Sequence, residues 1–421
     1  MTGKNRFPDC NPKDARQPVG MSGSRLEART RRIRRLLVAA YLMFLLALVE
    51  LFAWPAGNLL QRKLLMYSPP QSGSQAISME EYLSIRDPEL GWPRKREFGQ
   101  RYALDGSRWC KGTDLPVDAE WLVSLYGDSF TADWVGGDND HWGCRMQKAL
   151  GATVKNFGIG GYGTDQAFIR YKTNERDHAR IVILGHMSEN IIRNLTRYRD
   201  FQTRQLDWAF KPRFVLGDAG NLTLIPLPTL DEGHYRRFIG VNSPPFILPH
   251  ENFAPGGAAG AVRHGFPHLV SLFQNLGYWE FRARLETVPN YGPFYDVEHP
   301  LQGVQLTSAI VLAFEREAIR RNQKSLVVIF PGPGDMHHYR KSGTWLYQNL
   351  IDALDNAGLH PYNFGPTLLQ YIGARPDESA FRSHHYTQDV SHLVADSVLA
   401  ELVKRGWVHP PGGVPNSRPG S

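Results

Sequence analysis

The pattern of apolar and polar positions first marks one long apolar run near the start of the chain. Residues 36–54 contain a single charge, Glu50, and about 20 apolar residues are enough to cross the core of a bilayer. By the positive-inside rule, a cluster of arginines just before the run predicts that the N-terminus stays in the cytoplasm and that everything after residue 55 lies outside it. The cluster consists of Arg25, Arg29, Arg31, Arg32, Arg34 and Arg35.

A cleaved signal peptide is the alternative interpretation of this run. The run is long for the apolar part of a signal, and the sequence LFAWPAG offers a poor cleavage site between small residues. We therefore expect a retained single-pass anchor in the inner, cytoplasmic membrane, with the rest of the chain in the periplasm or outside the cell.

From Glu120 onward, short apolar stretches alternate with helical patterns. Buried strands are predicted over residues 121–126, 153–158, 179–185 and 325–331, with a further one over 359–364. Helices are predicted over residues 141–150, 165–177, 306–322, 345–359 and 391–406. This alternation predicts an α/β fold, a three-layer α/β/α arrangement around a mostly parallel sheet of the flavodoxin-like type.

The alternation breaks between residues 196 and 300, where Pro, Gly, Tyr, Phe and Arg are frequent and a hairpin is predicted over 211–228. We interpret this block as a lid-like insertion over the edge of the sheet. The expected organisation is a disordered basic tail (1–35), a transmembrane helix (36–54), a linker or leading segment (55–119), the α/β/α domain (120–409) with its insertion, and a disordered tail (410–421).

Composition and charge limit the classes of function that we expect for this chain. The chain has 421 residues and a net charge of +7, but much of the excess comes from the arginines before the apolar run. No spaced Cys/His zinc pattern and no aromatic RNA-binding motif occurs, so we expect neither nucleic-acid binding nor a metal or other cofactor. Cys110 and Cys144 fall on the exported side and could pair there, although two free buried thiols fit the sequence as well.

Three predicted strands end in segments rich in Gly, Ser or Asn: residues 127–129, 156–166 and 185–194. Ligands bind at the carboxyl ends of strands in open parallel sheets. Acyl transfer needs a hydroxyl nucleophile, a base and N–H donors for the oxyanion, and these segments offer such groups. The simpler alternatives are that Ser129 is a turn serine, that Asn190 caps a helix, and that the glycines cradle a phosphate.

In this order the segments resemble the SGNH, or GDSL-type, hydrolase family over roughly residues 120–195 and 305–405. Gly127-Asp128-Ser129 is similar to the family's first block, which makes Ser129 the nucleophile. NFGIGGYG is similar to the second block, with the Gly161 N–H facing the oxyanion, and the Asn190 amide corresponds to the donor of the third block. The resemblance implies that Ser129, Gly161 and Asn190 together form the oxyanion hole.

The fourth block of the family carries the base, and here the sequence departs from the pattern. Aligning the family's helix on Val394-Ala395 makes His385 the base and Thr387 the helix cap, but Arg382 then occupies the position of the acid. Asp377 or Glu378 could supply a carboxylate in its place. The other interpretation takes Asp389 and His392 as the literal acid-x-x-His pair, inside the final helix.

The resemblance implies a serine esterase acting outside the cytoplasm, on small acyl groups such as acetyl on envelope glycans, or on lipid esters. An O-acyltransferase to polysaccharide, fed by a membrane acyltransferase partner, is one alternative. A degenerate domain that only binds a glycan or a membrane partner is another. Arg193 and Arg197, just beyond Asn190, are expected to be solvated.

Overall fold

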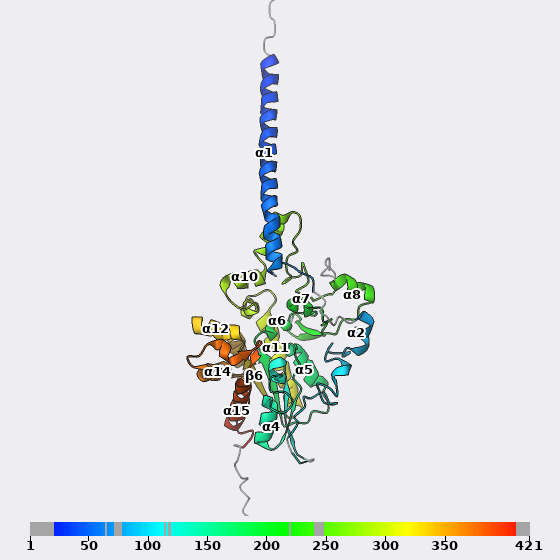
Figure 1. Cartoon of the computed structure of the whole chain (residues 1–421), viewed down its shortest axis with the longest axis vertical. Coiled ribbons are helices and arrows are strands. Elements are labelled where there is room, and N and C mark those ends of the chain that lie inside the picture. The colour runs from blue at the N-terminus through cyan, green and yellow to red at the C-terminus, as the bar shows by residue number, and fades with distance from the viewer. Residues whose placement is uncertain are drawn as a thin grey trace, which may run out of the picture.

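The computed structural model describes residues 21–63, 65–70, 78–112, 115–116, 119–218, 220–239 and 248–409. Figure 1 shows helix α1 (Met21–Arg62) projecting alone from one end of the folded domain. By length and composition, it is the one helix in the described ranges that could cross a membrane. The predictions of disordered tails over residues 1–20 and 410–421 lie outside the described residues.

The start of α1 corrects one prediction. Residues 21–35, assigned to a disordered tail, are helical and continue into the apolar run without a break. From Ser24 to Arg35 the chain contains neither Gly nor Pro, and Arg, Leu, Ala and Glu are good helix formers. We predicted disorder from the many charges of this segment, but its residues have high helix propensity, and the helix continues through them.

The central sheet has five parallel strands in the order β2-β1-β3-β6-β7. The order reverses between β1 and β3, which makes this position the switch point where ligands bind in such sheets. The prediction of a parallel α/β fold is confirmed. The strands are β1 (Trp121–Tyr126), β2 (Thr153–Asn156), β3 (Ile181–Met187), β6 (Lys324–Phe330) and β7 (Tyr362–Asn363).

Helices cover both faces of the sheet because its connections run in both directions. Right-handed crossovers from β1 to β2 and from β2 to β3 place their helices on opposite faces. Accordingly α4 (Trp142–Leu150) packs with α15 (Gln388–Lys404), and α5 (Thr164–Thr173) packs with α11 (Gly303–Arg320). The remaining helices of this domain are α3 (Ser129–Ala132), α6 (Asn190–Arg193), α12 (Pro333–Ser342), α13 (Gln348–Asn356) and α14 (Gly365–Ile372).

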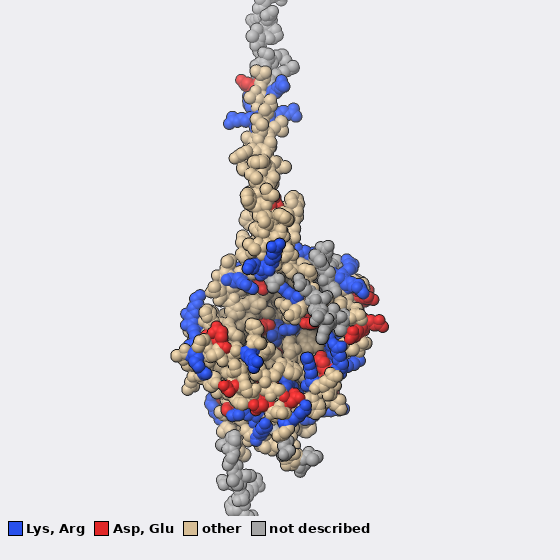
Figure 2. All heavy atoms as spheres, in the orientation of Figure 1, with Lys and Arg blue, Asp and Glu red and all other residues tan. Residues whose placement is uncertain are grey.

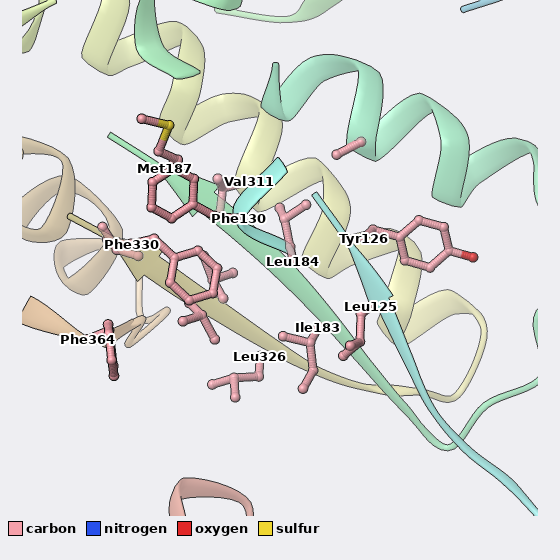
Figure 3. Packing of buried hydrophobic residues seen from close by; sticks show 14 of the residues in the cluster. Leu125, Tyr126, Phe130, Ile183, Leu184, Met187, Val311, Leu326, Phe330 and Phe364 are labelled. Atoms are coloured by element: carbon pink, nitrogen blue, oxygen red, sulfur yellow. The ribbon is translucent and has the colours of Figure 1, made fainter. Parts of the chain in front are cut away.

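The core reaches to the carboxyl ends of the strands. Figure 3 shows Phe130 among the buried side chains, near Phe330 and Met187. The rings of Phe130 and Phe330 have their centroids 6.3 Å apart. Because Phe130 is anchored in the core, its neighbour Ser129 is held at the end of β1.

The insertion and the leading segment form a second core. Tyr82 of α2 (Met79–Ile85) stacks on Trp208 and meets Phe210 and Tyr235 of the insertion. The predicted hairpin is present as β4 and β5, but it packs on α5 and α11 and not over the edge of the sheet. The elements of the insertion are α7 (Asp200–Thr203), β4 (Arg213–Leu216), β5 (Leu222–Ile225), α8 (Glu232–Ile239), α9 (His268–Asn275), α10 (Trp279–Glu286) and the 3-10 turn Gly292–Tyr295.

Two smaller features complete the fold. Cys110 and Cys144 form a disulfide with their Cα atoms 5.4 Å apart, which ties the leading segment to α4. Before α15, the short strands β8 (Phe381–Arg382) and β9 (His385–Tyr386) form a hairpin. The turns Lys95–Glu97 and Asp377–Ala380 are 3-10 helices.

Candidate active site

Ser129 is the first residue of α3, directly after the end of β1. The Asp128 side chain caps this helix by accepting a hydrogen bond from the Phe130 N–H at 2.8 Å. Ser129 is 8% exposed, and within the described ranges neither its Oγ nor its N–H makes a hydrogen bond. A turn serine would ordinarily bond to its own turn, so this hydroxyl is available for chemistry.

The glycine-rich segment after β2 is held tightly against α3. Asn156 Nδ2 donates to the Thr131 carbonyl at 2.7 Å, and Asn156 Oδ1 accepts from the Gly158 N–H at 2.9 Å. A Cβ on Gly158 would lie 2.4 Å from the backbone nitrogen of Ala132. Only glycine allows this approach, which places the second block beside Ser129.

Gly161 lies further along the same segment, with φ of +80°. Such a positive φ favours glycine, because a Cβ would meet the preceding backbone. The Gly161 N–H has no acceptor among the residues described. A free, rigidly placed N–H is what an oxyanion donor requires.

Asn190 begins α6, just after β3, and is fully buried. Its Oδ1 accepts a hydrogen bond from Arg193 at 3.0 Å, and its Nδ2 makes no hydrogen bond within the described part of the chain. Buried amide donors are seldom left unsatisfied. Burial raises the pKa of Asp128, and Arg193 and the Asn190 side chain lower it. Asn190 Nδ2 is therefore a second donor, beside Asp128, that makes no well-formed hydrogen bond with a described residue.

Arg193 connects all three strand-end segments, and its predicted solvation is wrong. Its guanidinium donates to the Tyr162 carbonyl at 3.1 Å and to Glu189 at 3.0 Å, and lies 3.6 Å from Asp128 Oδ2. The side chain is only 6% exposed. Arg197 is buried too, and donates to the Pro226 and Pro249 carbonyls. Nothing in the sequence around these two arginines indicated that they would be buried.

His385 lies on β9, with its ring 5.5 Å from that of Phe130. Its Nδ1 lies 3.2 Å from the Ser383 carbonyl. Since a carbonyl can only accept, Nδ1 carries the proton and Nε2 is free to take one. No hydrogen bond joins His385 to Ser129 in the described structure. The Ser383 carbonyl takes the place of the predicted carboxylate partner of His385. Asp377 pairs with Arg340 at 2.6 Å instead, and no contact links Glu378 to the imidazole in the described structure.

His392 lies inside α15, as the alternative interpretation required, but its acid is different. His392 Nε2 lies 2.8 Å from Asp140 Oδ2. Asp389 is exposed in the first turn of the helix and makes no contact with His392. The pairing of Asp389 with His392 is therefore wrong, because a loop carboxylate reaches the imidazole from outside the helix.

A buried polar network behind the site was not predicted. Asp335, just beyond β6, accepts hydrogen bonds from the Ser188 hydroxyl, the Gly332 N–H at 2.7 Å and the Tyr291 hydroxyl at 2.9 Å. Burial raises the pKa of Asp335 to about 6. The end of β6 thus also carries a carboxyl group. The signal for it in the sequence was an Asp a few residues after a predicted buried strand.

His186, within β3, belongs to the same buried region. The Tyr295 hydroxyl donates to the Ser188 carbonyl at 2.6 Å, so it accepts from His186 Nε2 at 3.1 Å, and His186 Nδ1 then accepts from Thr164. Burial, with the nearby Arg193 charge, lowers the pKa of His186 to about 3. This imidazole is neutral and structural.

A cavity of about 340 Å³ lies beside the glycine segment. Arg199 lines it, and its guanidinium is 3.1 Å from where a Cβ on Gly161 would lie. That guanidinium makes no hydrogen bond or ion pair with any described residue, and burial followed by the Arg193 charge lowers its pKa to about 10. The aromatic side chains lining the cavity are Tyr82, Trp92, Tyr102, Trp134 and Trp208.

Within the described residues, no three His, Cys, Asp or Glu side chains gather as a metal site. His264 and His268 come within 3.1 Å of each other, without a carboxylate to complete a metal site. The hydrogen-bond donors beside Ser129, the Gly161 N–H and Asn190 Nδ2, suit an oxyanion.

No family model matches the chain, and no curated protein matches it. Among solved structures it is similar to a G-D-S-L family lipolytic protein from Desulfitobacterium hafniense, at 9% identity over 66% of this chain and 98% of that one, with a TM-score of 0.31. It is also similar to the acetyl xylan esterase AlAXEase, at 12% identity over 67% and 99%, with a TM-score of 0.34.

A catalytic mutant of Axe2, an acetylxylan esterase from Geobacillus stearothermophilus, is similar at 9% identity over 70% of this chain and 99% of that one, with a TM-score of 0.34. The fold rests on the observed strand order. In the order of its strand-end motifs, this chain resembles the GDSL-type hydrolases.

Proposed function

We propose that this chain is a serine-dependent ester hydrolase that removes small acyl groups from a glycan outside the cytoplasm. The observation that carries the proposal is the set of unused hydrogen-bonding groups at the switch point of the sheet. The Ser129 hydroxyl, the Ser129 and Gly161 N–H groups and Asn190 Nδ2 make no hydrogen bond with a described residue, and they follow three adjacent strands.

In the proposed reaction, Ser129 Oγ attacks the acyl carbon while His385 Nε2 takes the hydroxyl proton. The three donors stabilise the negative charge that develops on the carbonyl oxygen. The bond from the acyl carbon to the alcohol oxygen then breaks, and His385 returns the proton to the departing alcohol. Water attacks the acyl-enzyme with His385 again as the base, which releases the acid and restores Ser129.

The cavity beside Gly161 supports a sugar as the alcohol part of the ester. Aromatic faces suit sugar rings, and Arg199, which has no ion pair with a described residue, suits a negative charge on the substrate. We therefore propose an acylated glycan that carries carboxylate or phosphate groups. The hydrophobic run of α1 and its arginines support a retained anchor with the domain outside the cytoplasm.

The nucleophile is tested with the full-length chain and p-nitrophenyl acetate. Ser129→Ala should abolish turnover above the rate without enzyme, and labelling by a fluorophosphonate should be lost with it. Asn190→Ala should lower kcat by roughly 100- to 1000-fold, as loss of one oxyanion donor does. Equal labelling of the wild type and Ser129→Ala would contradict the proposal.

The base is tested by three histidine variants measured under the same conditions. His385→Ala should lose acylation, whereas His392→Ala should retain most of it because its Nε2 is occupied by Asp140. His384→Ala is the matched control, because His384 is exposed in the turn between β8 and β9, next to His385, and this variant should retain most of the acylation.

A further inference from the structure

Helix α9 carries an exposed apolar stripe beside α1. Phe266, Val270, Phe273 and Leu276 are 82%, 48%, 64% and 56% exposed. Val270 and Phe273 lie within α9 and Leu276 is its C-cap residue, so their spacing of three residues places them along one side of the helix. Phe266 precedes the N-cap residue Pro267 and extends the exposed apolar surface beyond the start of the helix. The opposite side, with Ser271 and Asn275, is buried. Contiguous exposed apolar side chains on a folded domain mark a contact site.

α9 is built onto the lower end of α1. Glu50 of α1 accepts hydrogen bonds from the backbone N–H groups of His268 and Leu269 at 2.7 and 3.1 Å. Gly57 lies so close to His264 that a Cβ there would stand 2.2 Å from the imidazole ring. The one carboxylate in the apolar run thus accepts hydrogen bonds from the start of α9, where helix N–H groups and the helix dipole favour an anion.

This attachment sets the level of α9 relative to a membrane. The contacts with Glu50 and Gly57 fall where the apolar run of α1 ends at Trp54. Figure 1 shows the yellow-green part of the chain lying along this end of α1. Figure 2 shows Lys and Arg side chains gathered on the domain near the same place, as suits anionic headgroups.

We propose that α9 lies in the membrane interface with its apolar stripe among the lipid chains, as a second contact beside α1. The occupant is lipid because the stripe continues the surface of α1 at the depth where a bilayer would end. Amphipathic helices bind bilayers in this way. Contacts of both α1 and α9 with the bilayer would fix the tilt of the domain relative to the membrane, whereas α1 alone would allow the tilt to vary. The proposal rests on α1 spanning the membrane.

The test uses the full-length chain in vesicles of phosphatidylethanolamine and phosphatidylglycerol. Cys10→Ser removes the third cysteine, and the Cys110–Cys144 disulfide does not react with a thiol label. A nitroxide label is then placed in turn through Phe273→Cys, Leu42→Cys and Leu104→Cys. Leu42 on α1 serves as the lipid control, and Leu104, 85% exposed in a turn beside β2, serves as the water control.

The label at residue 273 should be accessible to oxygen dissolved in lipid and protected from a water-soluble nickel complex, as the label at residue 42 is. Accessibility to nickel equal to that at residue 104 would overturn the proposal. Protection from both reagents would overturn it as well, because it would mean that protein covers the stripe. The label at residue 42 reports separately whether α1 itself is inserted.

Discussion

Single residues at this site are explained by what surrounds them. Gly127 and Gly185 both face Thr131, whose Oγ1 would lie 2.0 and 2.1 Å from an added Cβ. The glycine of the Gly-Asp-Ser segment is therefore a packing requirement, and Asp128 is a helix cap. The Asp128 carboxylate also pairs with Arg193, whereas the Ser129 hydroxyl makes no hydrogen bond with any described residue.

Arg199 leads to a prediction about substrate charge. Arg199→Gln should lower the ratio of kcat/KM for a carboxylate-bearing acetyl ester to that for a neutral acetyl ester by roughly 10- to 100-fold, since a hydrogen bond to a charged group contributes about 1.5–3 kcal/mol. Arg199→Lys should restore part of this ratio.

Arg180→Gln is the matched control for that comparison. Arg180 is exposed and precedes β3, at the opposite end of the strand from the site. The ratio should not change in this variant. An unchanged ratio in Arg199→Gln would mean that the cavity does not bind the anionic part of the substrate.

Asp335 leads to a prediction about pH. Its pKa of about 6 in the folded chain lies above its ordinary value of 3.8, so its protonated form is favoured by folding. The stability that this group contributes is present at low pH and is lost as pH rises through about 6. Asp335→Asn removes the titration while keeping an acceptor for the three hydrogen bonds.

The free energy of unfolding measures this effect, by denaturant titration of the full-length chain in detergent. Between pH 4.5 and 7.5, the wild type should lose about 2 kcal/mol relative to Asp335→Asn. Asp200 also titrates in this range, because burial raises its pKa to about 7, so only the difference between the two proteins is diagnostic. A difference that does not vary with pH would contradict the assigned environment.

At the scale of elements, one buried ion pair attaches the insertion to α5. Lys211 lies 2.5 Å from Asp165, both side chains are fully buried, and Lys211 also donates to the Arg193 carbonyl. Breaking such a pair leaves a buried charge without a partner. The insertion is thereby fastened to the helix that follows the glycine segment.

Lys211→Met should destabilise the folded chain by about 3–5 kcal/mol, measured by denaturant titration. Adding Asp165→Asn should recover a large part of that loss, because the unpaired charge is gone. Lys111→Met breaks the half-exposed pair with Asp138 and should cost less than about 1 kcal/mol. Similar losses in Lys211→Met and Lys111→Met would show that the buried pair does not fasten the insertion.

At the scale of the whole molecule, α1 and the domain are joined by contacts and not only by the chain. α1 has 42 residues, about 63 Å at 1.5 Å per residue, which exceeds the roughly 30 Å core of a bilayer. Its last part packs on the insertion through Glu50, Ala53 and Gly57. A cleaved signal peptide would take these contacts away.

We therefore expect the mature protein to keep residues 36–62. Intact mass of the protein purified from membranes should match a chain that includes them, and alkaline carbonate should not extract it. A mature N-terminus beyond residue 55 would support the signal-peptide alternative. Retention would leave Glu50 in place as the cap of α9.

The sequence by itself determined the parallel sheet, the strand-end positions of Ser129, Gly161 and Asn190, and the candidate membrane helix. Apolar periodicity and glycine spacing are local properties of the sequence, so they can be interpreted without knowing which distant residues pack together. Only the tertiary structure decided the burial of Arg193, the pairing of His392 with Asp140, the carbonyl behind His385, and the second core, whose Tyr82 and Trp208 line the cavity. Each of these depends on groups far apart in the chain, whose burial and pairing follow from packing and not from local pattern.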